Sequence, residues 1–235
     1  MQTVILCGGM GTRIASVARG LPKALIPVAG RPFIEHQFDR LAACGLRDVL
    51  LLVGIGGDRI EAHVGDGAAW GMRVAYSRES PDRLLGTGGA LVNALPRLAE
   101  SFLVMYGDSY LTVDYRAVAA AFQASGCPAM MTVYRNEGRW DASNTRVEDG
   151  RVVFYSKKAR PGEAAWIDYG LTAFRRSVIE DRRPAPMPLD MAAILGDLVP
   201  AGRVAAFETP DRFYEIGKPE GLAELDTLLR PPAGS

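Results

Sequence analysis

The feature that most constrains this chain is an alternation of short apolar runs with helical segments through its first half. Residues 49–53 are wholly apolar, which is typical of a strand buried on both faces of a parallel sheet. A helix is expected after Pro32, because apolar residues recur at helical spacing until Gly45 supplies a left-handed stop. Parallel strands need crossover connections of this kind. The pattern therefore predicts an α/β fold with a mostly parallel sheet.

Charge balance and cysteine content narrow the class of protein further. The 27 basic residues match the 27 acidic ones, which argues against binding nucleic acid through a general basic surface. No apolar run reaches the length of about 18 residues that suggests a membrane span. The three scattered cysteines form neither a disulfide framework nor a zinc cluster. We expect a cytoplasmic protein that binds neither nucleic acid nor membrane.

One domain is expected over residues 1–230, followed by a short tail at 231–235. The regular alternation occupies about 1–112, whereas about 113–230 is less regular but contains no repeat or low-complexity tract. The proline-rich stretch at 182–188 is too short to be a domain linker. The two parts therefore read as halves of one unit of 235 residues, which is long enough to bury a sizeable core.

The first chemical motif is a glycine-rich loop after the first strand. Glycines let backbone amides approach a phosphate chain without a Cβ in the way, and arginine and lysine can bind phosphate oxygens. A plain glycine-rich turn is the alternative, because the string matches neither the P-loop nor the G-x-G-x-x-G pattern. The candidate nucleotide-binding residues in and after this strand are Leu6, Gly8, Gly9, Gly11, Thr12, Arg13 and Lys23.

A second glycine-rich stretch covers residues 85–90, between the third expected strand and the next helix. It contains Gly86, Thr87 and Gly88, whose amides at a helix N-terminus could face an anion or lie under a base. A tight loop followed by a helix start explains the same residues equally well.

A third motif places Asp108 directly after an apolar strand and Gly107. Ligands of open α/β sheets gather at the carboxyl ends of the strands, and a carboxylate there suits Mg²⁺. An aspartate that only caps a turn is the alternative.

The complete string Gly-Gly-x-Gly-Thr-Arg, then eight residues, then Pro-Lys resembles the opening motif of the sugar-1-phosphate nucleotidylyltransferases. The resemblance extends in order over most of residues 1–222 and implies a Rossmann-like (GT-A-like) three-layer αβα sandwich with a mixed, mostly parallel sheet. In that family the first loop wraps a nucleoside triphosphate (NTP), the second contacts nucleobase and sugar, and Gly-Asp binds metal. Arg13, Lys23 and Asp108 would thus be catalytic, with Asp108 on Mg²⁺.

Three further segments resemble the family's sugar pocket and second metal ligand, each with one substitution. Lys157 would hold the sugar phosphate beside Ser156, which replaces a glutamate; a shift of one residue would select Lys158 instead. Asp168, near Gly170, replaces an asparagine and loses its amide donor. The last segment has Glu215 where relatives have the second metal-binding aspartate, so the metal contact could run through water.

The implied reaction transfers a nucleoside monophosphate from an NTP to a sugar 1-phosphate and releases pyrophosphate. No histidine base is needed, and His36 and His63 have no partner at catalytic spacing in the sequence. The opening motif looks most like that of D-glycero-D-manno-heptose 1-phosphate guanylyltransferases, so GTP is favoured. Mannose-1-phosphate guanylyltransferases, uridylyl-, thymidylyl- or cytidylyltransferases for another sugar or a phosphonate, and a non-catalytic nucleotide-sugar binder stay open. Relatives often form dimers or tetramers, so the resemblance also implies a homo-oligomer.

Overall fold

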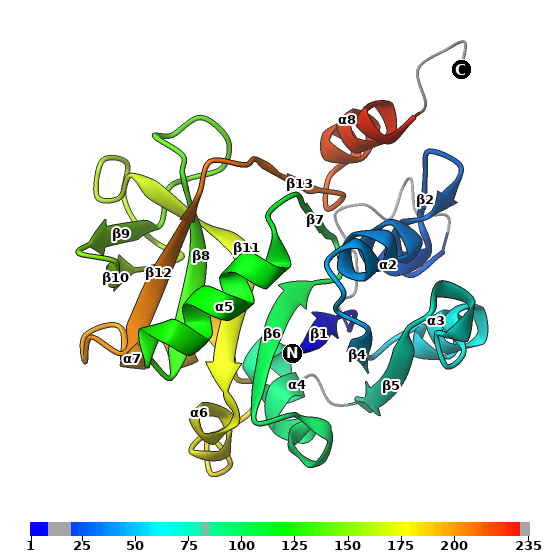
Figure 1. Ribbon diagram of the computed structural model, residues 1–235, viewed down its shortest axis with the longest axis horizontal. Coiled ribbons are helices and arrows are strands. Elements are labelled where there is room, and N and C mark those ends of the chain that lie inside the picture. The colour runs from blue at the N-terminus through cyan, green and yellow to red at the C-terminus, as the bar shows by residue number, and fades with distance from the viewer. Residues whose placement is uncertain (9–19, 81, 83–84, 231–235) are drawn as a thin grey trace.

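The structure is a computed structural model that describes residues 1–8, 20–80, 82 and 85–230 (Figure 1). Within these residues the main sheet has nine strands in the order β5-β4-β1-β6-β11-β8-β12-β10-β9. In chain order these strands are β1 (Gln2–Leu6), β4 (Asp48–Val53), β5 (Arg73–Arg78), β6 (Ser101–Tyr106), β8 (Ala129–Arg135), β9 (Thr145–Glu148), β10 (Arg151–Tyr155), β11 (Trp166–Arg175) and β12 (Val204–Thr209).

The sheet is parallel in its first half and mixed in its second. Strands β5, β4, β1 and β6 run parallel, whereas β11 lies antiparallel to both β6 and β8. Strand β12 is parallel to β8, and the β9–β10 hairpin closes the far edge. The chain steps from β1 outward to β4 and β5 and then returns to place β6 on the other side of β1. This reversal of direction leaves a crevice at the carboxyl ends of β1 and β6.

Helices cover both faces of the sheet, which gives three layers (Figure 1). Side chains alternate along each strand, so Ile5 faces one layer and Val4 the other. The first layer contains α2 (Phe33–Ala43), α3 (Gly57–Val64) and α5 (Tyr115–Ser125). The second contains α4 (Gly86–Asn93), α6 (Arg176–Glu180) and α7 (Met191–Leu198). The architecture confirms the expected α/β fold class.

A small group of elements packs beside this sandwich and brings the end of the chain back to the sheet. It comprises β2 (Pro27–Val28), β3 (Arg31–Pro32), β7 (Ser109–Leu111), β13 (Phe213–Glu215) and α8 (Pro219–Leu229). Strand β13 pairs with β7, which sets Glu215 opposite Ser109. The remaining 3₁₀ turns are η2 (Lys23–Leu25), η3 (Ala68–Trp70) and η4 (Leu95–Arg97).

One detail differs from the sequence expectations, and the tail lies outside the described residues. Helix α4 begins at Gly86, so the second glycine-rich stretch forms its first turn instead of a loop before it. Strand β11 passes through Gly170, and its register against β8 shifts between Asp168 and Thr172.

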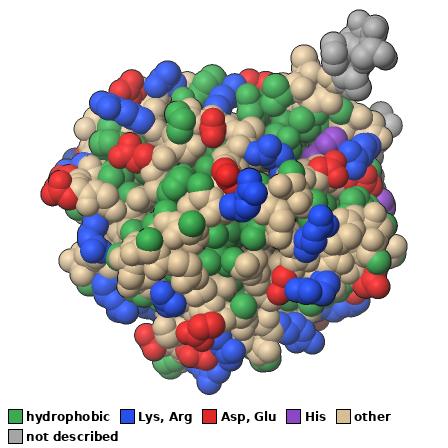
Figure 2. All heavy atoms as spheres, in the orientation of Figure 1, with side chains coloured by type: hydrophobic (Ala, Val, Ile, Leu, Met, Phe, Trp, Pro, Cys, Tyr) green, Lys and Arg blue, Asp and Glu red, His purple; other side chains and the backbone are tan. Residues whose placement is uncertain are grey.

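Surface charge and helix length both agree with the sequence. On the face drawn in Figure 2, Lys and Arg side chains are intermixed with Asp and Glu, which matches the equal numbers in the sequence. No helix in the described part of the chain is both long and apolar enough to span a bilayer.

Candidate active site

A cavity of about 410 Å³ opens at the carboxyl ends of β1 and β6. It lies at the reversal in strand order, where open α/β sheets bind their ligands. Residues from both glycine-rich motifs and from the Gly-Asp motif line it together. The lining residues are Leu6, Cys7, Gly8, Lys23, Ala24, Leu52, Glu79, Gly86, Thr87, Ala90, Tyr106, Gly107, Asp108 and Pro188.

Backbone pairing brings the ends of the two strands together. Leu6 is level with Tyr106 in the parallel register, and the N–H of Gly107 donates to the carbonyl of Leu6 at 3.0 Å. A Cβ on Gly107 would lie 2.8 Å from that carbonyl oxygen and 3.0 Å from Cys7 Sγ. Glycine is therefore required for Asp108 to follow the strand this closely.

Lys23 and Asp108, far apart in the sequence, form an ion pair in this cavity. Lys23 Nζ donates to Asp108 Oδ2 at 2.6 Å, and the two side chains are 17% and 24% exposed. The N–H of Ile216 holds the carbonyl of Asp108 at 2.9 Å, and Gly217 lies against the pair. A cation and a carboxylate thus meet at one wall, where each remains accessible to a phosphate or a metal.

Acidic side chains gather around the hydroxyl of Tyr106. Burial raises the pKa of Tyr106, and the carboxylates of Asp168, Asp190, Asp108 and Glu215 raise it further, in that order. The two expected metal ligands therefore belong to one electrostatic environment.

Asp108 suits a magnesium ion, because Mg²⁺ is commonly held by one or two carboxylates, several waters and substrate phosphates. Glu215 lies opposite Ser109, the residue that follows Asp108, but it is exposed and does not line the cavity. Among the described residues no three His, Cys, Asp or Glu side chains are grouped to hold a metal.

The second glycine-rich motif contributes less to the cavity than expected. The N–H groups of Gly88 and Gly89 both donate to the carbonyl of Leu189, at 2.8 and 3.1 Å, so they do not face an anion. Gly88 is buried, and a Cβ there would meet Leu189 and Asp190 at 3.0 and 3.1 Å. Close packing of α4 against the residues before α7 is thus one reason for glycine here. Of Gly86, Thr87 and Gly88, which were expected to contact the nucleotide, the first two line the cavity.

Lys157 meets a carboxylate that sequence reasoning missed. Its Nζ lies 2.7 and 3.0 Å from the two carboxylate oxygens of Asp190, which precedes α7. Thr87 Oγ1 donates to the same carboxylate at 3.0 Å. Lys158 is exposed, and its backbone N–H donates to Ser156 Oγ. A Lys-Asp contact between residues 33 apart carries no local sequence signal.

Asp168 and Gly170 lie on β11 and do not line the cavity. The hydroxyl of Tyr155 donates to Asp168 Oδ2 at 3.2 Å, and the N–H of Gly170 donates to Oδ1 at 2.9 Å. Burial raises the pKa of Asp168, although these two donors and Lys157 oppose the rise. Asp168 thus carries a partly buried carboxylate that is hydrogen-bonded to Tyr155, and its contact with sugar hydroxyls stays a prediction.

Glu79 is a cavity residue for which the sequence analysis had no assignment. It follows β5, and its carboxylate would approach within 3.4 Å of a Cβ on Gly8. Burial raises the pKa of Glu79, and a hydrogen bond from the backbone of Leu85 lowers it. Its position after a strand that ends at the ligand edge was the available signal.

At the other side of β1, burial and the charge of Asp108 raise the pKa of the Cys7 thiol to about 12.

The assignments to Gly9, Gly11, Thr12 and Arg13 fall outside the described residues. Of the first motif, the structure describes Leu6 and Gly8, which line the cavity, and Lys23.

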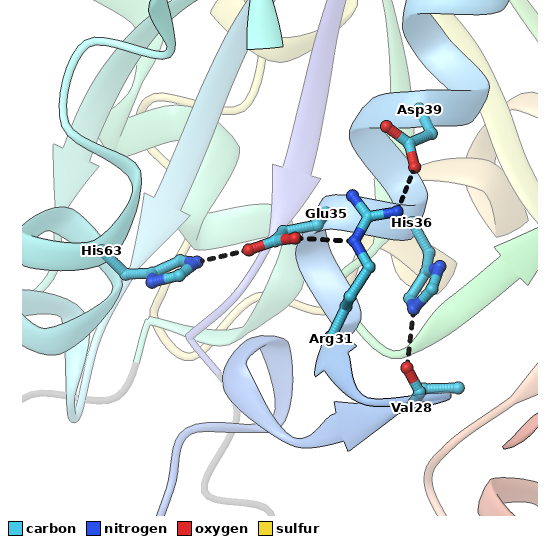
Figure 3. Close-up of polar contacts among 6 residues, drawn as sticks. All are labelled: Val28, Arg31, Glu35, His36, Asp39 and His63. Atoms are coloured by element: carbon cyan, nitrogen blue, oxygen red, sulfur yellow. Dashed lines mark hydrogen bonds and ion pairs between the residues drawn. The ribbon is translucent and has the colours of Figure 1, made fainter. Parts of the chain in front are cut away.

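The two histidines have structural contacts away from this cavity (Figure 3). His36 Nε2 lies 2.8 Å from the carbonyl oxygen of Val28 in a buried position. His63 Nε2 lies 3.0 Å from Glu35, which also accepts from Arg31. The tertiary fold therefore gives His63 an acidic partner that the sequence did not suggest, in an ion-pair network that joins α3 to α2.

Comparisons with known proteins identify the family of this chain. A family model described as the MobA-like NTP transferase domain matches residues 3–185. The mannose-1-phosphate guanylyltransferase of Mycobacterium tuberculosis is 31% identical, over 98% of this chain and 66% of that protein. The D-glycero-alpha-D-manno-heptose 1-phosphate guanylyltransferase of Aneurinibacillus thermoaerophilus is 30% identical over 77% of each chain. The chain spans about half to two thirds of the length of several curated relatives that it matches.

A solved structure agrees over almost the whole fold. The crystal structure of HddC from Yersinia pseudotuberculosis complexed with GMP-PN superposes with a TM-score of 0.80 at 25% identity, over 97% of this chain and 99% of that one. The chain therefore belongs to the MobA-like NTP transferase family, among the sugar-1-phosphate nucleotidylyltransferases.

Proposed function

We propose that this protein transfers a nucleoside monophosphate from an NTP to a sugar 1-phosphate, giving a nucleotide sugar and pyrophosphate. The observation that carries the proposal is the Lys23–Asp108 pair, set in a cavity at the ligand edge where both glycine-rich motifs meet. A cation for phosphate and a carboxylate for metal are the two groups that such a transfer requires. We also propose that residues 1–230 form one domain, because the main sheet takes its strands from both halves of the chain.

In the proposed reaction a phosphate oxygen of the sugar 1-phosphate attacks the α-phosphorus of the NTP. That oxygen–phosphorus bond forms while the bond to the bridging oxygen breaks, and pyrophosphate leaves with the electron pair. The nucleophile has a second pKa near ~6 and is largely dianionic at neutral pH, so the protein need not supply a base. What the protein must supply is charge neutralisation and alignment.

Each charged residue has a defined task in this scheme. Lys23, with Arg13, holds the triphosphate, and Lys157 holds the sugar phosphate; its contact with Asp190 favours it over Lys158. Asp108 and Glu215 would hold Mg²⁺, which supplies Lewis-acid neutralisation of the phosphate oxygens when bound. Asp168 would accept hydrogen bonds from sugar hydroxyls.

GTP is the proposed nucleotide, and Glu79 is the residue that favours it. The sheet order places β5 and Glu79 at the opposite side of β1 from Asp108, so a base near Glu79 leaves its phosphates near Lys23. An ionised carboxylate only accepts hydrogen bonds. Guanine presents two adjacent donors, N1–H and N2–H₂, whereas uracil and thymine flank one donor with acceptors. The guanylyltransferase names among the relatives support the same choice.

D-glycero-D-manno-heptose 1-phosphate is the proposed sugar substrate, with mannose 1-phosphate as the second candidate. Both choices rest on the names of relatives that are 30–35% identical. We place the reaction in the cytoplasm, where thiols such as those of this chain stay reduced.

A pyrophosphate-release panel tests the proposal. GTP, ATP, UTP, CTP and dTTP are each combined with heptose, mannose and glucose 1-phosphates, with Mg²⁺ or with EDTA. We expect release with GTP and one sugar phosphate, and none with EDTA. Release with another NTP would overturn the choice of base alone. No release from any pair, combined with binding of a nucleotide sugar, would show a non-catalytic binder.

A further inference from the structure

Three elements that the reaction must coordinate meet at a single carboxylate. Asp190 lies at the N-cap of α7, Lys157 follows β10, and Thr87 is in the first turn of α4. Thr87 lines the cavity, and its contact with Asp190 links the proposed nucleotide site to Lys157, the proposed ligand of the sugar phosphate. Neither glycine-rich motif nor the Lys157 segment includes Asp190, which is 103 residues from Thr87 in the chain.

The carboxylate of Asp190 is held by hydrogen bonds other than its contact with Lys157. Its Oδ1 accepts from the backbone N–H of Ala192 at 2.9 Å and from Thr87 Oγ1 at 3.0 Å. Thr87 Oγ1 in turn accepts from the N–H of Met191 at 2.8 Å. The pKa of Asp190 stays below its usual range: burial opposes ionisation, but the donors, Lys157 above all, outweigh it.

Lys157 has the longer and more flexible side chain of the two in this contact. A lysine ammonium sits on a flexible four-carbon stem, whereas Asp190 is anchored to two helices. The ammonium has three donors and is still 49% exposed in the ion pair. A phosphate can therefore approach Lys157 without displacing Asp190, and it meets an ammonium whose orientation is already set. Less side-chain freedom is then lost on binding.

We propose that Asp190 is a positioning residue for the transfer. It fixes Lys157 against α4, so that the sugar phosphate binds in the correct position relative to the nucleotide. This inference rests on the proposed function. A competing effect has the opposite sign, because Asp190 also neutralises Lys157 and repels a phosphate dianion. The two effects predict opposite changes when the charge of Asp190 is removed, and the test below separates them.

The test is a double-mutant cycle with Asp190→Asn and Lys157→Ala. Asparagine is a good N-cap, so α7 keeps its cap while the charge is lost. We expect Asp190→Asn to lower kcat/KM for the sugar 1-phosphate about tenfold at saturating NTP, with the KM for NTP within about twofold of wild type. In the Lys157→Ala background, Asp190→Asn should cost less than about twofold more, because the two residues act as one unit.

Asp114→Asn is the matched control, because Asp114 caps α5 through the same kind of contact, away from the cavity. It should leave kcat/KM unchanged. Asp190→Ser keeps a capping oxygen but cannot reach the ammonium, and it should repeat the loss seen with asparagine.

Three results would overturn the inference. The first is a fall in the KM for the sugar phosphate in Asp190→Asn. The second is a loss of kcat/KM on Asp190→Asn that is the same in the Lys157→Ala background as in the wild type, and the third is a rise in the KM for NTP as large as the rise in the KM for the sugar phosphate. If the wild-type protein turns over and one of these results is found, the proposed function stands and only the inference falls. A wild-type protein with no activity on the panel would overturn the proposed function itself and, with it, the inference.

Discussion

At the scale of single residues, the site is built from charges that are already partnered before any substrate binds. Lys23 pairs with Asp108, and Lys157 pairs with Asp190. Lysine and aspartate in these pairs keep 17–51% of their side-chain surface exposed, so phosphate or metal can reach them. Glu79 differs, because its carboxylate is partly buried and accepts a hydrogen bond from the backbone of Leu85 instead of forming one of these ion pairs.

Glu79→Gln should change the choice of nucleotide. The amide turns a donor toward the donors of guanine, so kcat/KM with GTP should fall about 10- to 100-fold, the scale of a charged hydrogen bond, while UTP loses nothing. Pyrophosphate release with each NTP measures this. Glu61→Gln is the control, because Glu61 pairs with Arg78 outside the cavity lining. A uniform loss over all NTPs would contradict the assignment.

The same residue predicts a pH effect on GTP binding. Burial raises the pKa of Glu79, and only the ionised form accepts both guanine donors. As the pH is lowered, the GTP affinity of the wild type should therefore begin to fall at a higher pH than it would with an exposed glutamate. The Glu79→Gln variant should not show this fall. Calorimetric titration of a non-hydrolysable GTP analogue across pH tests it.

Asp168→Asn should stabilise the substrate-free protein at neutral pH. Burial raises the pKa of Asp168 in the folded state, so the folded protein resists losing this proton while the unfolded chain loses it near pH ~4. The wild type therefore loses stability relative to the variant as pH rises from about 4 through the raised pKa. Thermal unfolding of both proteins at about pH 4 and pH 8 gives the comparison. A Tm difference that is equal at both pH values would count against a buried charge.

At the scale of elements, the start of helix α4 at Gly86 is set by hydrogen bonds between its first turn and the segment before α7. Gly86 has φ +74°, and Leu189 receives the amides of Gly88 and Gly89 while its own N–H donates to Leu85. The contact holds Thr87 beside the cavity and Asp190 beside Thr87. Stability and site geometry thus depend on the same contact.

Gly86→Ala should destabilise the protein by about 1–3 kcal/mol, because the new Cβ would lie 2.5 Å from the carbonyl oxygen of Leu189 at a positive φ. Gly196→Ala is the matched control within α7. Its Cβ meets nothing within 4 Å, so alanine should stabilise by about 0.5–1 kcal/mol. Urea unfolding of both variants measures the two changes. Equal effects of the two substitutions would contradict the steric argument.

At the scale of the whole molecule, the first half of the chain lines the cavity, with Pro188 added from the second half, and strands of the second half support its walls. Strand β6, which ends two residues before Asp108, pairs with β1 of the first half and β11 of the second. Strand β13 then returns to β7 and places Glu215 at the same edge. A ligand that contacts both halves should therefore stabilise the entire fold.

Magnesium and GTP together should raise the Tm of the protein. A ligand present at 100 times its Kd adds about 2.7 kcal/mol, which corresponds to roughly 5–10 °C for a chain of this size. Thermal scans with GTP and Mg²⁺, with GTP and EDTA, and with UTP and Mg²⁺ test the metal and the base separately. Equal shifts with GTP and UTP would argue against a guanine preference.

The sequence by itself determined the fold class and most of the chemical groups. Alternating apolar runs predict parallel strands, because each period is local, and motifs such as Gly107-Asp108 place chemistry at the ends of those strands. The resemblance carried by the first loop was specific because it combines several spacings in one string.

Only the tertiary structure decided which of these groups meet. The Lys23–Asp108 and Lys157–Asp190 contacts join residues 85 and 33 positions apart, and no periodicity encodes such contacts. It also decided that the amides of Gly88 and Gly89 serve helix packing, and that Glu79 reaches the cavity. The physical reason is that pairing, burial and charge neutralisation depend on distances through space, which the order of strands in the sheet sets and the order of residues in the chain does not.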